Sequence, residues 1–134
     1  MDPIQVLIID EHRAVCRALA SRLNSVGSIK VIGATCDFTE GVKVAQFAQP
    51  DIILLELKAS GHCGDQGPNL NPLAAISQLL QTGRSSVIIL TSYLDEAELD
   101  TAIGAGAKRY LLKDIDTEKL VSEIEAVARE QISV

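Results

Sequence analysis

Four apolar segments of this chain each end in polar residues that could take part in chemistry. They are Asp10 and Glu11 after residues 4–9, Glu56 after residues 52–55, Thr91 after residues 87–90 and Lys113 after residues 110–112. If the segments are parallel strands of one sheet, these residues meet at its carboxyl edge, where open α/β sheets place their sites. Three carboxylates in one pocket repel one another, so a divalent cation, the lysine or a raised carboxyl pKa must compensate.

Segments with helical periodicity separate these strands. In the first, Val15, Leu19 and Val26 lie on one helix face, and a further strand is predicted at residues 30–34. Residues suited to beginning a helix precede the other segments: Thr39, Asn71 with Pro72, Asp95 and Asp116. Strand and helix therefore alternate five times. This order predicts an α/β fold, a doubly wound parallel sheet of five strands with two helices on one face and three on the other.

Composition limits the class of protein. The 134 residues fit a single domain. Because 47% of them are hydrophobic but only 3% are aromatic, aliphatic side chains should form the core. The net charge of -6 disfavours direct nucleic-acid binding by this domain, since such binding depends on clustered Lys and Arg.

The cysteines bear on the compartment. Cys16, Cys36 and Cys63 are odd in number and lack C-x-x-C spacing. The sequence shows neither a signal peptide nor an apolar run of membrane length. We therefore expect a cytoplasmic protein without a membrane partner, in which two cysteines are small buried hydrophobes and one is a loop thiol.

Four blocks of the sequence, in this order, resemble the signature segments of response-regulator receiver domains. They are residues 6–12 (VLIIDEH), 50–57 (PDIILLEL), 89–92 (ILTS) and 104–114 (GAGAKRYLLKD). The last block is similar to the subgroup whose receivers usually precede a helix-turn-helix output domain. The resemblance implies strand order 2-1-3-4-5 and a signalling domain rather than an enzyme. It also implies a homodimer, with a sensor histidine kinase and an output domain as candidate partners.

The resemblance further implies roles for individual residues. In a typical receiver, the third strand ends in an aspartate that accepts a phosphoryl group from a kinase histidine, assisted by Mg²⁺ on an acidic pair. Here that acceptor position is Glu56. The other matching residues are Asp10 and Glu11 for the acidic pair, Lys58 for the backbone carbonyl that completes the metal site, Thr91 and Tyr110 for the switch, and Lys113 for the lysine that pairs with phosphate.

Glutamate at the acceptor position is the main departure from the family. Phosphoryl transfer depends on in-line positioning, and an offset of ~1 Å can cost about a hundredfold in rate. Glu56 would extend its carboxylate into the phosphoryl space, pair there with Lys113 or accept from Thr91, and mimic part of the phosphorylated state. Such a charge would draw Thr91 and Tyr110 inward. We expect Mg²⁺ to bind weakly or not at all.

Two functions remain open for this pocket. In the first, phosphorylation is lost or impaired, and the domain signals by dimerisation or partner docking through the fourth helix, fifth strand and fifth helix. In the second, Glu56 still accepts phosphate with Mg²⁺, as in a conventional phospho-switch. A third interpretation is that Glu56 is a relic without a function, solvated at the sheet edge.

Residues 58–71 form a second departure, a connection longer than the family's usual turn and rich in glycine. Such a loop could cover the pocket as a lid or contact a partner. His62, Cys63 and Asp65 within it are a weak metal signal, and no strand end holds Asp65 near the lysine as a substitute acceptor. Residues 1–134 are predicted to be one receiver domain, with any output domain outside this chain.

The sequence disfavours two other functions, cobalamin binding and nucleotide binding. Asp10-Glu11-His12 is similar to the Asp-x-His-x-x-Gly motif of cobalamin-binding domains, but Val15 stands at the glycine position. No G-x-G-x-x-G loop follows the first strand, which disfavours nucleotide binding. We therefore interpret His12 as a surface residue at a helix start.

Overall fold

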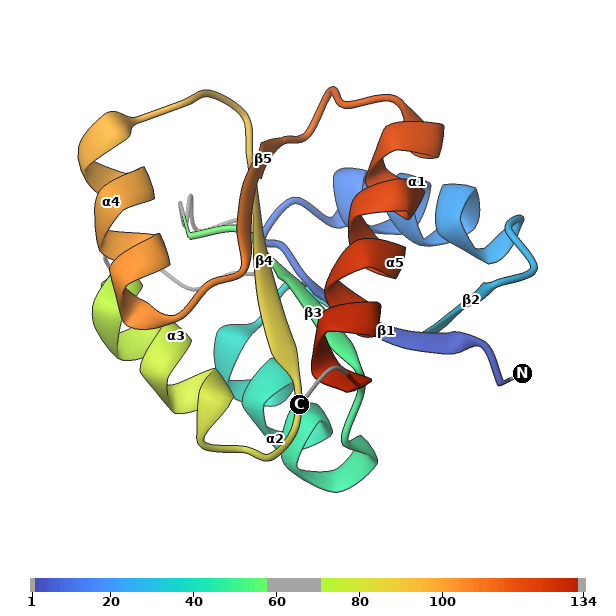
Figure 1. Ribbon diagram of the computed structural model, residues 1–134, viewed down its shortest axis with the longest axis horizontal. Helices are drawn as coiled ribbons and strands as arrows, with labels where there is room; N and C mark the ends of the chain where they lie inside the picture. Colours follow the sequence, from blue (N-terminus) through green and yellow to red (C-terminus); the bar gives the residue numbers. More distant parts are fainter. Residues whose placement is uncertain (1, 58–70, 133–134) are drawn as a thin grey trace.

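The computed structural model describes residues 2–57 and 71–132, through which strands and helices alternate (Figure 1). The strands are β1 (Ile4–Ile9), β2 (Ile29–Thr35), β3 (Ile52–Leu55), β4 (Ser86–Thr91) and β5 (Arg109–Leu112). The helices are α1 (Arg13–Asn24), α2 (Phe38–Ala48), α3 (Pro72–Leu80), α4 (Glu96–Ala105) and α5 (Thr117–Ile132). This order is the one predicted from periodicity, and β2 extends one residue further at each end.

The strands form one parallel sheet in the order β2-β1-β3-β4-β5, which confirms the predicted topology. The inner strands β3 and β4 are buried along their whole length. Helices cover both faces of such a sheet, so its strands read as continuous apolar runs rather than alternating ones. Because all five strands are parallel, their carboxyl ends meet at one edge of the sheet.

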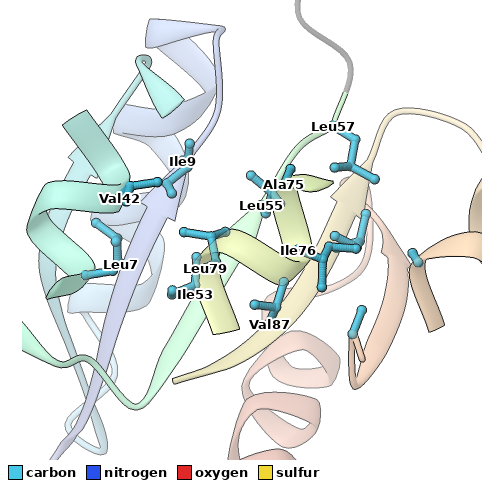
Figure 2. Packing of buried hydrophobic residues seen from close by; sticks show 14 of the residues in the cluster. Leu7, Ile9, Val42, Ile53, Leu55, Leu57, Ala75, Ile76, Leu79 and Val87 are labelled. Carbon is cyan, nitrogen blue, oxygen red and sulfur yellow. The ribbon is translucent and has the colours of Figure 1, made fainter. Parts of the chain in front are cut away.

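Each face of the sheet carries its own hydrophobic cluster, because successive side chains of a strand point to opposite faces. Leu7 and Ile53 pack with residues of α2, α3 and α4 in one cluster (Figure 2). Ile8 and Leu54 pack with residues of α1 and α5 in the other. The predicted division of two helices and three is therefore confirmed. Burial of each such side chain stabilises the fold by about 1.5–3 kcal/mol, so both helix layers are held against the strands.

The helix starts differ from the prediction at one position. Asp37, rather than Thr39, is the N-cap of α2, and its carboxylate accepts hydrogen bonds from the N–H groups of Thr39 and Glu40. The prediction was wrong because Asp37 already lies in extended backbone, from which its carboxylate reaches the first-turn donors. Asn71 and Asp95 cap α3 and α4 as predicted.

A left-handed glycine ends α4 and leads the chain toward β5. Gly106 has φ 115°, and its N–H donates to the carbonyls of Ala102 and Ile103. A Cβ atom there would lie 2.7 Å from Leu80 Cδ1. The backbone conformation therefore favours glycine at this turn, and a side chain there would also have to displace the end of Leu80.

The cysteine prediction holds for one residue and is wrong for another. Cys16 is a free, buried thiol on α1, and burial is the main cause that raises its pKa to about 11. Cys36, just past the end of β2, is half-buried and disulfide-bonded rather than a buried free thiol. Cys63 lies outside the described residues. Among the described helices, none is both long and apolar enough to cross a membrane.

Candidate functional site

The carboxyl edge of the sheet gathers five predicted site residues from four strands. Backbone hydrogen bonds continue the strand pairing just past β1, β3 and β5. They run from the N–H of Asp10 to Thr35 O (3.0 Å), from Glu56 to Ile9 O (3.0 Å) and from Lys113 to Thr91 O (2.8 Å). Because each bond joins one strand end to its neighbour, the backbone fixes where the functional side chains begin.

Lys113 joins two of the carboxylates. Its Nζ lies 2.6 Å from Asp10 Oδ2 and 3.0 Å from Glu56 Oε1, and its side chain is only 14% exposed. Burial lowers the pKa of Lys113, but hydrogen bonds to both carboxylates and their negative charges outweigh that effect and raise it. The lysine is therefore held as an ammonium ion between Asp10 and Glu56.

Glu11 and His12 form the other half of the pocket. His12 Nδ1 lies 3.2 Å from Glu11 Oε1 and 3.4 Å from Asp10 Oδ1. The pKa of Glu11 is raised, first by burial and then by the charges of Asp10 and Glu56, while its backbone hydrogen bond and His12 oppose the rise. Two groups thus offset the predicted repulsion among the carboxylates: Lys113 beside Asp10 and Glu56, and the His12 imidazole beside Asp10 and Glu11.

The predicted Mg²⁺ ligands are Asp10, Glu11, Glu56 and Lys58, of which Lys58 lies outside the described residues. Mg²⁺ needs oxygen ligands at about 2.0–2.1 Å in octahedral order. Lys113 already holds one oxygen of Asp10 and one of Glu56, so a shared ion would have to displace the ammonium group. In this arrangement the three carboxylates do not fit Mg²⁺.

The two predicted switch residues, Thr91 and Tyr110, form hydrogen bonds with groups outside the cluster of three carboxylates. Thr91 is buried, and its hydroxyl donates to Tyr93 O at 3.2 Å. Tyr110 is 9% exposed, and its hydroxyl donates to Glu98 Oε1 on α4 at 2.7 Å. Burial and this hydrogen bond raise the pKa of the Tyr110 phenol, which keeps it neutral and able to donate. Tyr110 is therefore buried and hydrogen-bonded to α4, and its role as a switch residue stays a prediction.

Sequence reasoning missed Glu98. It stands three residues after the N-cap Asp95, whose carboxylate accepts from the Glu98 N–H at 3.0 Å. This Asp-x-x-Glu pattern marks a helix start and places Glu98 in the first turn. The pattern gives no sign of Tyr110, because that contact exists only once α4 packs beside β5.

The doubly wound five-stranded sheet, with acidic residues and a lysine at its carboxyl edge, defines a receiver-like fold. The sequence matches the response regulator receiver domain family over residues 6–125, and the chain belongs to this family.

Two curated response regulators are similar to this chain over most of its length. The chain is 34% identical over 127 residues to the transcriptional regulatory protein LiaR of Bacillus subtilis (strain 168), covering 94% of this chain and 56% of LiaR. It is 29% identical over 128 residues to the nitrate/nitrite response regulator NarL of Escherichia coli (strain K12), covering 95% and 56%. The chain thus spans about half the length of these relatives.

Two solved structures share the fold at low identity. The receiver domain of the putative response regulator NarL from Mycobacterium tuberculosis superposes with a TM-score of 0.83 at 19% identity, covering 96% of this chain and 98% of that one. A CheY-like receiver domain protein from Methanospirillum hungatei JF-1 gives 0.82 at 18% identity, covering 98% of each chain. These two structures show the fold, and the family match over residues 6–125 shows that the chain is a response regulator receiver domain.

Proposed function

We propose that this receiver domain signals without conventional phosphorylation, by dimerisation or by docking a partner. The observation that carries the proposal is the position of Lys113, bound to Asp10 at 2.6 Å and to Glu56 at 3.0 Å. The lysine that the family pairs with a phosphoryl group is here paired with the glutamate at the acceptor position. Glu56 thus supplies a permanent negative charge where a receiver normally acquires one.

Three requirements of phosphoryl transfer are compromised together. The nucleophilic oxygen must be in line with the donor, a metal must meet charge on the transferring oxygens, and a cation must be available to them. Glu56 has an extra methylene and contacts Lys113, and Lys113 also holds Asp10. Each contact must break before a phosphoryl group and a metal ion enter, so we propose that Mg²⁺ binds weakly at best.

The second candidate is a conventional phospho-switch in which Glu56 accepts phosphate. The observation that favours it is the retention of the whole surrounding set at the sheet edge, including Asp10, Thr91 and Lys113. Both candidates describe signalling rather than turnover of a substrate, so we propose no enzymatic role.

Acetyl phosphate separates the two candidates. The native protein, Glu56→Asp and Glu56→Gln are incubated with acetyl phosphate and Mg²⁺, and their intact masses are measured. We expect no phosphate adduct on the native protein or on Glu56→Gln, and a measurable adduct on Glu56→Asp, because the shorter carboxylate withdraws from the lysine. Equal modification of the native protein and Glu56→Asp would establish the conventional switch.

The partners follow from the relatives as proposals. LiaR is a transcriptional regulatory protein of which this chain matches about half, so we propose that an output domain accompanies this receiver in its full protein. We propose a sensor histidine kinase as a docking partner, a homodimer as the signalling form and the cytoplasm as the compartment. Disulfides are rare in the cytoplasm, so the disulfide at Cys36 bears on the proposed compartment. Thiol labelling of cell extracts tests whether Cys36 is oxidised in the cell.

A further inference from the structure

We propose that the pocket holds a transition-metal ion of the Zn²⁺ type on Asp10, Glu11 and His12, rather than Mg²⁺ on its three carboxylates. The proposal goes beyond the signalling role above, because it concerns which cation this chain binds. It starts from the disagreement already described, in which the acceptor-side carboxylate has been withdrawn from metal binding by Lys113.

The pocket divides its donor atoms between two partners. Lys113 takes Asp10 Oδ2 and Glu56 Oε1, at 2.6 and 3.0 Å. The other oxygen of Asp10, Oδ1, faces Nδ1 of His12 at 3.4 Å, and the same nitrogen faces Glu11 Oε1 at 3.2 Å. Two oxygens and one imidazole nitrogen therefore converge on the side of the pocket away from the lysine.

The spacing of these donors fits a tetrahedral ion. With metal–ligand bonds of about 2.0–2.1 Å, tetrahedral donors lie roughly 3.3–3.4 Å apart, whereas neighbouring octahedral donors around Mg²⁺ lie roughly 2.9 Å apart. The two distances from His12 Nδ1, 3.2 and 3.4 Å, match the tetrahedral value. The three donor atoms all lie within 4.8 Å of one another, and an ion between the two carboxylates would draw that pair closer.

The chemistry of the donors points to the same class of ion. Imidazole nitrogen suits Zn²⁺, Cu²⁺ and Ni²⁺, while Mg²⁺ prefers sites made only of oxygen. Asp10 and Glu11 are buried and His12 is 39% exposed, which leaves a path for an ion and for a water as fourth ligand. The backbone N–H of His12 donates to Asp10 Oδ1 at 2.9 Å and orients that carboxylate, as outer hydrogen bonds commonly do for metal ligands.

His12 can be replaced without removing a helix cap. It is the N-cap residue of α1, but its side chain makes no capping hydrogen bond there. His12→Ala should therefore fold, and His62→Ala is the matched control, because the chain contains only these two histidines.

The test uses metal-free protein titrated with Co²⁺ alone, followed by visible absorption, and with Zn²⁺ alone, followed by calorimetry. We expect one ion per chain with the absorption of tetrahedral Co²⁺, retained in excess Mg²⁺. His12→Ala should weaken binding by about tenfold or more, on the scale of changes to metal-site residues. His62→Ala should bind as the native protein does.

Each contrary outcome overturns the assignment. Absence of Co²⁺ binding, or equal binding by His12→Ala, would mean that His12 only forms ion pairs with the two carboxylates. Loss of binding in His62→Ala would move the ion to the 58–71 segment, and a near-ultraviolet thiolate band would move it to a cysteine. Ready displacement by Mg²⁺ would restore an oxygen-only site. None of these readouts depends on acetyl phosphate, so failure here is distinct from failure of the phosphorylation proposal.

Discussion

The acidic pocket and the predicted switch region, Tyr110 with Glu98 on α4, differ in what holds their key side chains. In the pocket, a buried ammonium ion lies between two buried carboxylates, with Lys113 in contact with Asp10 and Glu56. At the switch, a neutral phenol donates to one half-buried carboxylate, from Tyr110 to Glu98. The first contact depends on the charge at position 56, whereas the second depends on the position of α4.

The difference bears on the expected coupling between Glu56 and the two predicted switch residues. We expected the Glu56 charge to draw both Thr91 and Tyr110 inward. Tyr110 is inward, but Thr91 donates to the carbonyl of Tyr93. The hydrogen bond of the Thr91 hydroxyl is therefore local to the β4–α4 connection, and the Tyr110 hydroxyl is bonded to Glu98 on α4.

The largest expected effect is the loss of Lys113. Lys113→Met leaves buried carboxylates without their shared cation, and breaking a buried ion pair in this way costs about 3–5 kcal/mol. We expect the free energy of unfolding, measured with urea at pH 7, to fall by about that amount. Adding Glu56→Gln to Lys113→Met should restore part of the loss. If Lys113→Met is as stable as the native protein, the pocket is not held by this pair.

The next largest effect concerns the switch. Tyr110→Phe removes a hydrogen bond to a charged acceptor, which typically contributes about 1.5–3 kcal/mol, at the lower end here because Glu98 is half-buried. Glu98→Ala should make Tyr110 more accessible, since the Glu98 carboxylate accepts the hydrogen bond of its hydroxyl.

Tyrosine fluorescence reads this change directly, because the chain has two tyrosines and no tryptophan. Tyr93 is 62% exposed, so a Tyr93→Phe background leaves Tyr110 as the sole reporter. We expect Glu98→Ala to increase quenching of that signal by iodide, and Glu96→Ala, at the exposed start of the same helix, to leave it unchanged. Identical quenching in both variants would remove Glu98 from the switch.

A smaller effect tests coupling between the two regions. Glu56→Gln keeps the side-chain shape and removes the charge, and we expect the native protein to self-associate or dock its partner more readily than this variant. Coupling energies of about 1–2 kcal/mol are usual, equivalent to about tenfold in the association constant. Sedimentation of both proteins over a concentration series measures it. The same association in both would leave Glu56 as a relic without a switching role.

The smallest effect is at the exposed edge of β5. Arg109 pairs with Glu123 at 2.8 Å and with Glu130 at 2.7 Å on α5. All three side chains are partly exposed, so solvent and salt screen the pairs, and Arg109→Gln should cost about 1 kcal/mol or less. Urea unfolding in low and high salt should show this difference shrinking with salt. A loss as large as that of Lys113→Met would contradict the distinction between exposed and buried pairs.

The sequence alone determined the architecture and the list of residues at the sheet edge. Apolar runs such as Ile52–Leu55 and the helical period between them depend on local spacing, and parallel strands joined by helices have few ways to pack. Even the most informative departure, Glu56, could be read directly, and its expected reach to Lys113 agrees with the structure.

Only the tertiary structure decided which groups those residues contact. The division of the Asp10 oxygens between Lys113 and His12, the bond from Thr91 to Tyr93 and the approach of Glu98 to Tyr110 follow from how strand ends and helices meet in space. Hydrogen bonds and ion pairs depend on separations of a few tenths of an ångström, whereas periodicity specifies only which face a side chain takes. For that reason the sequence could propose a pocket, and only the folded chain could show how its charges are paired.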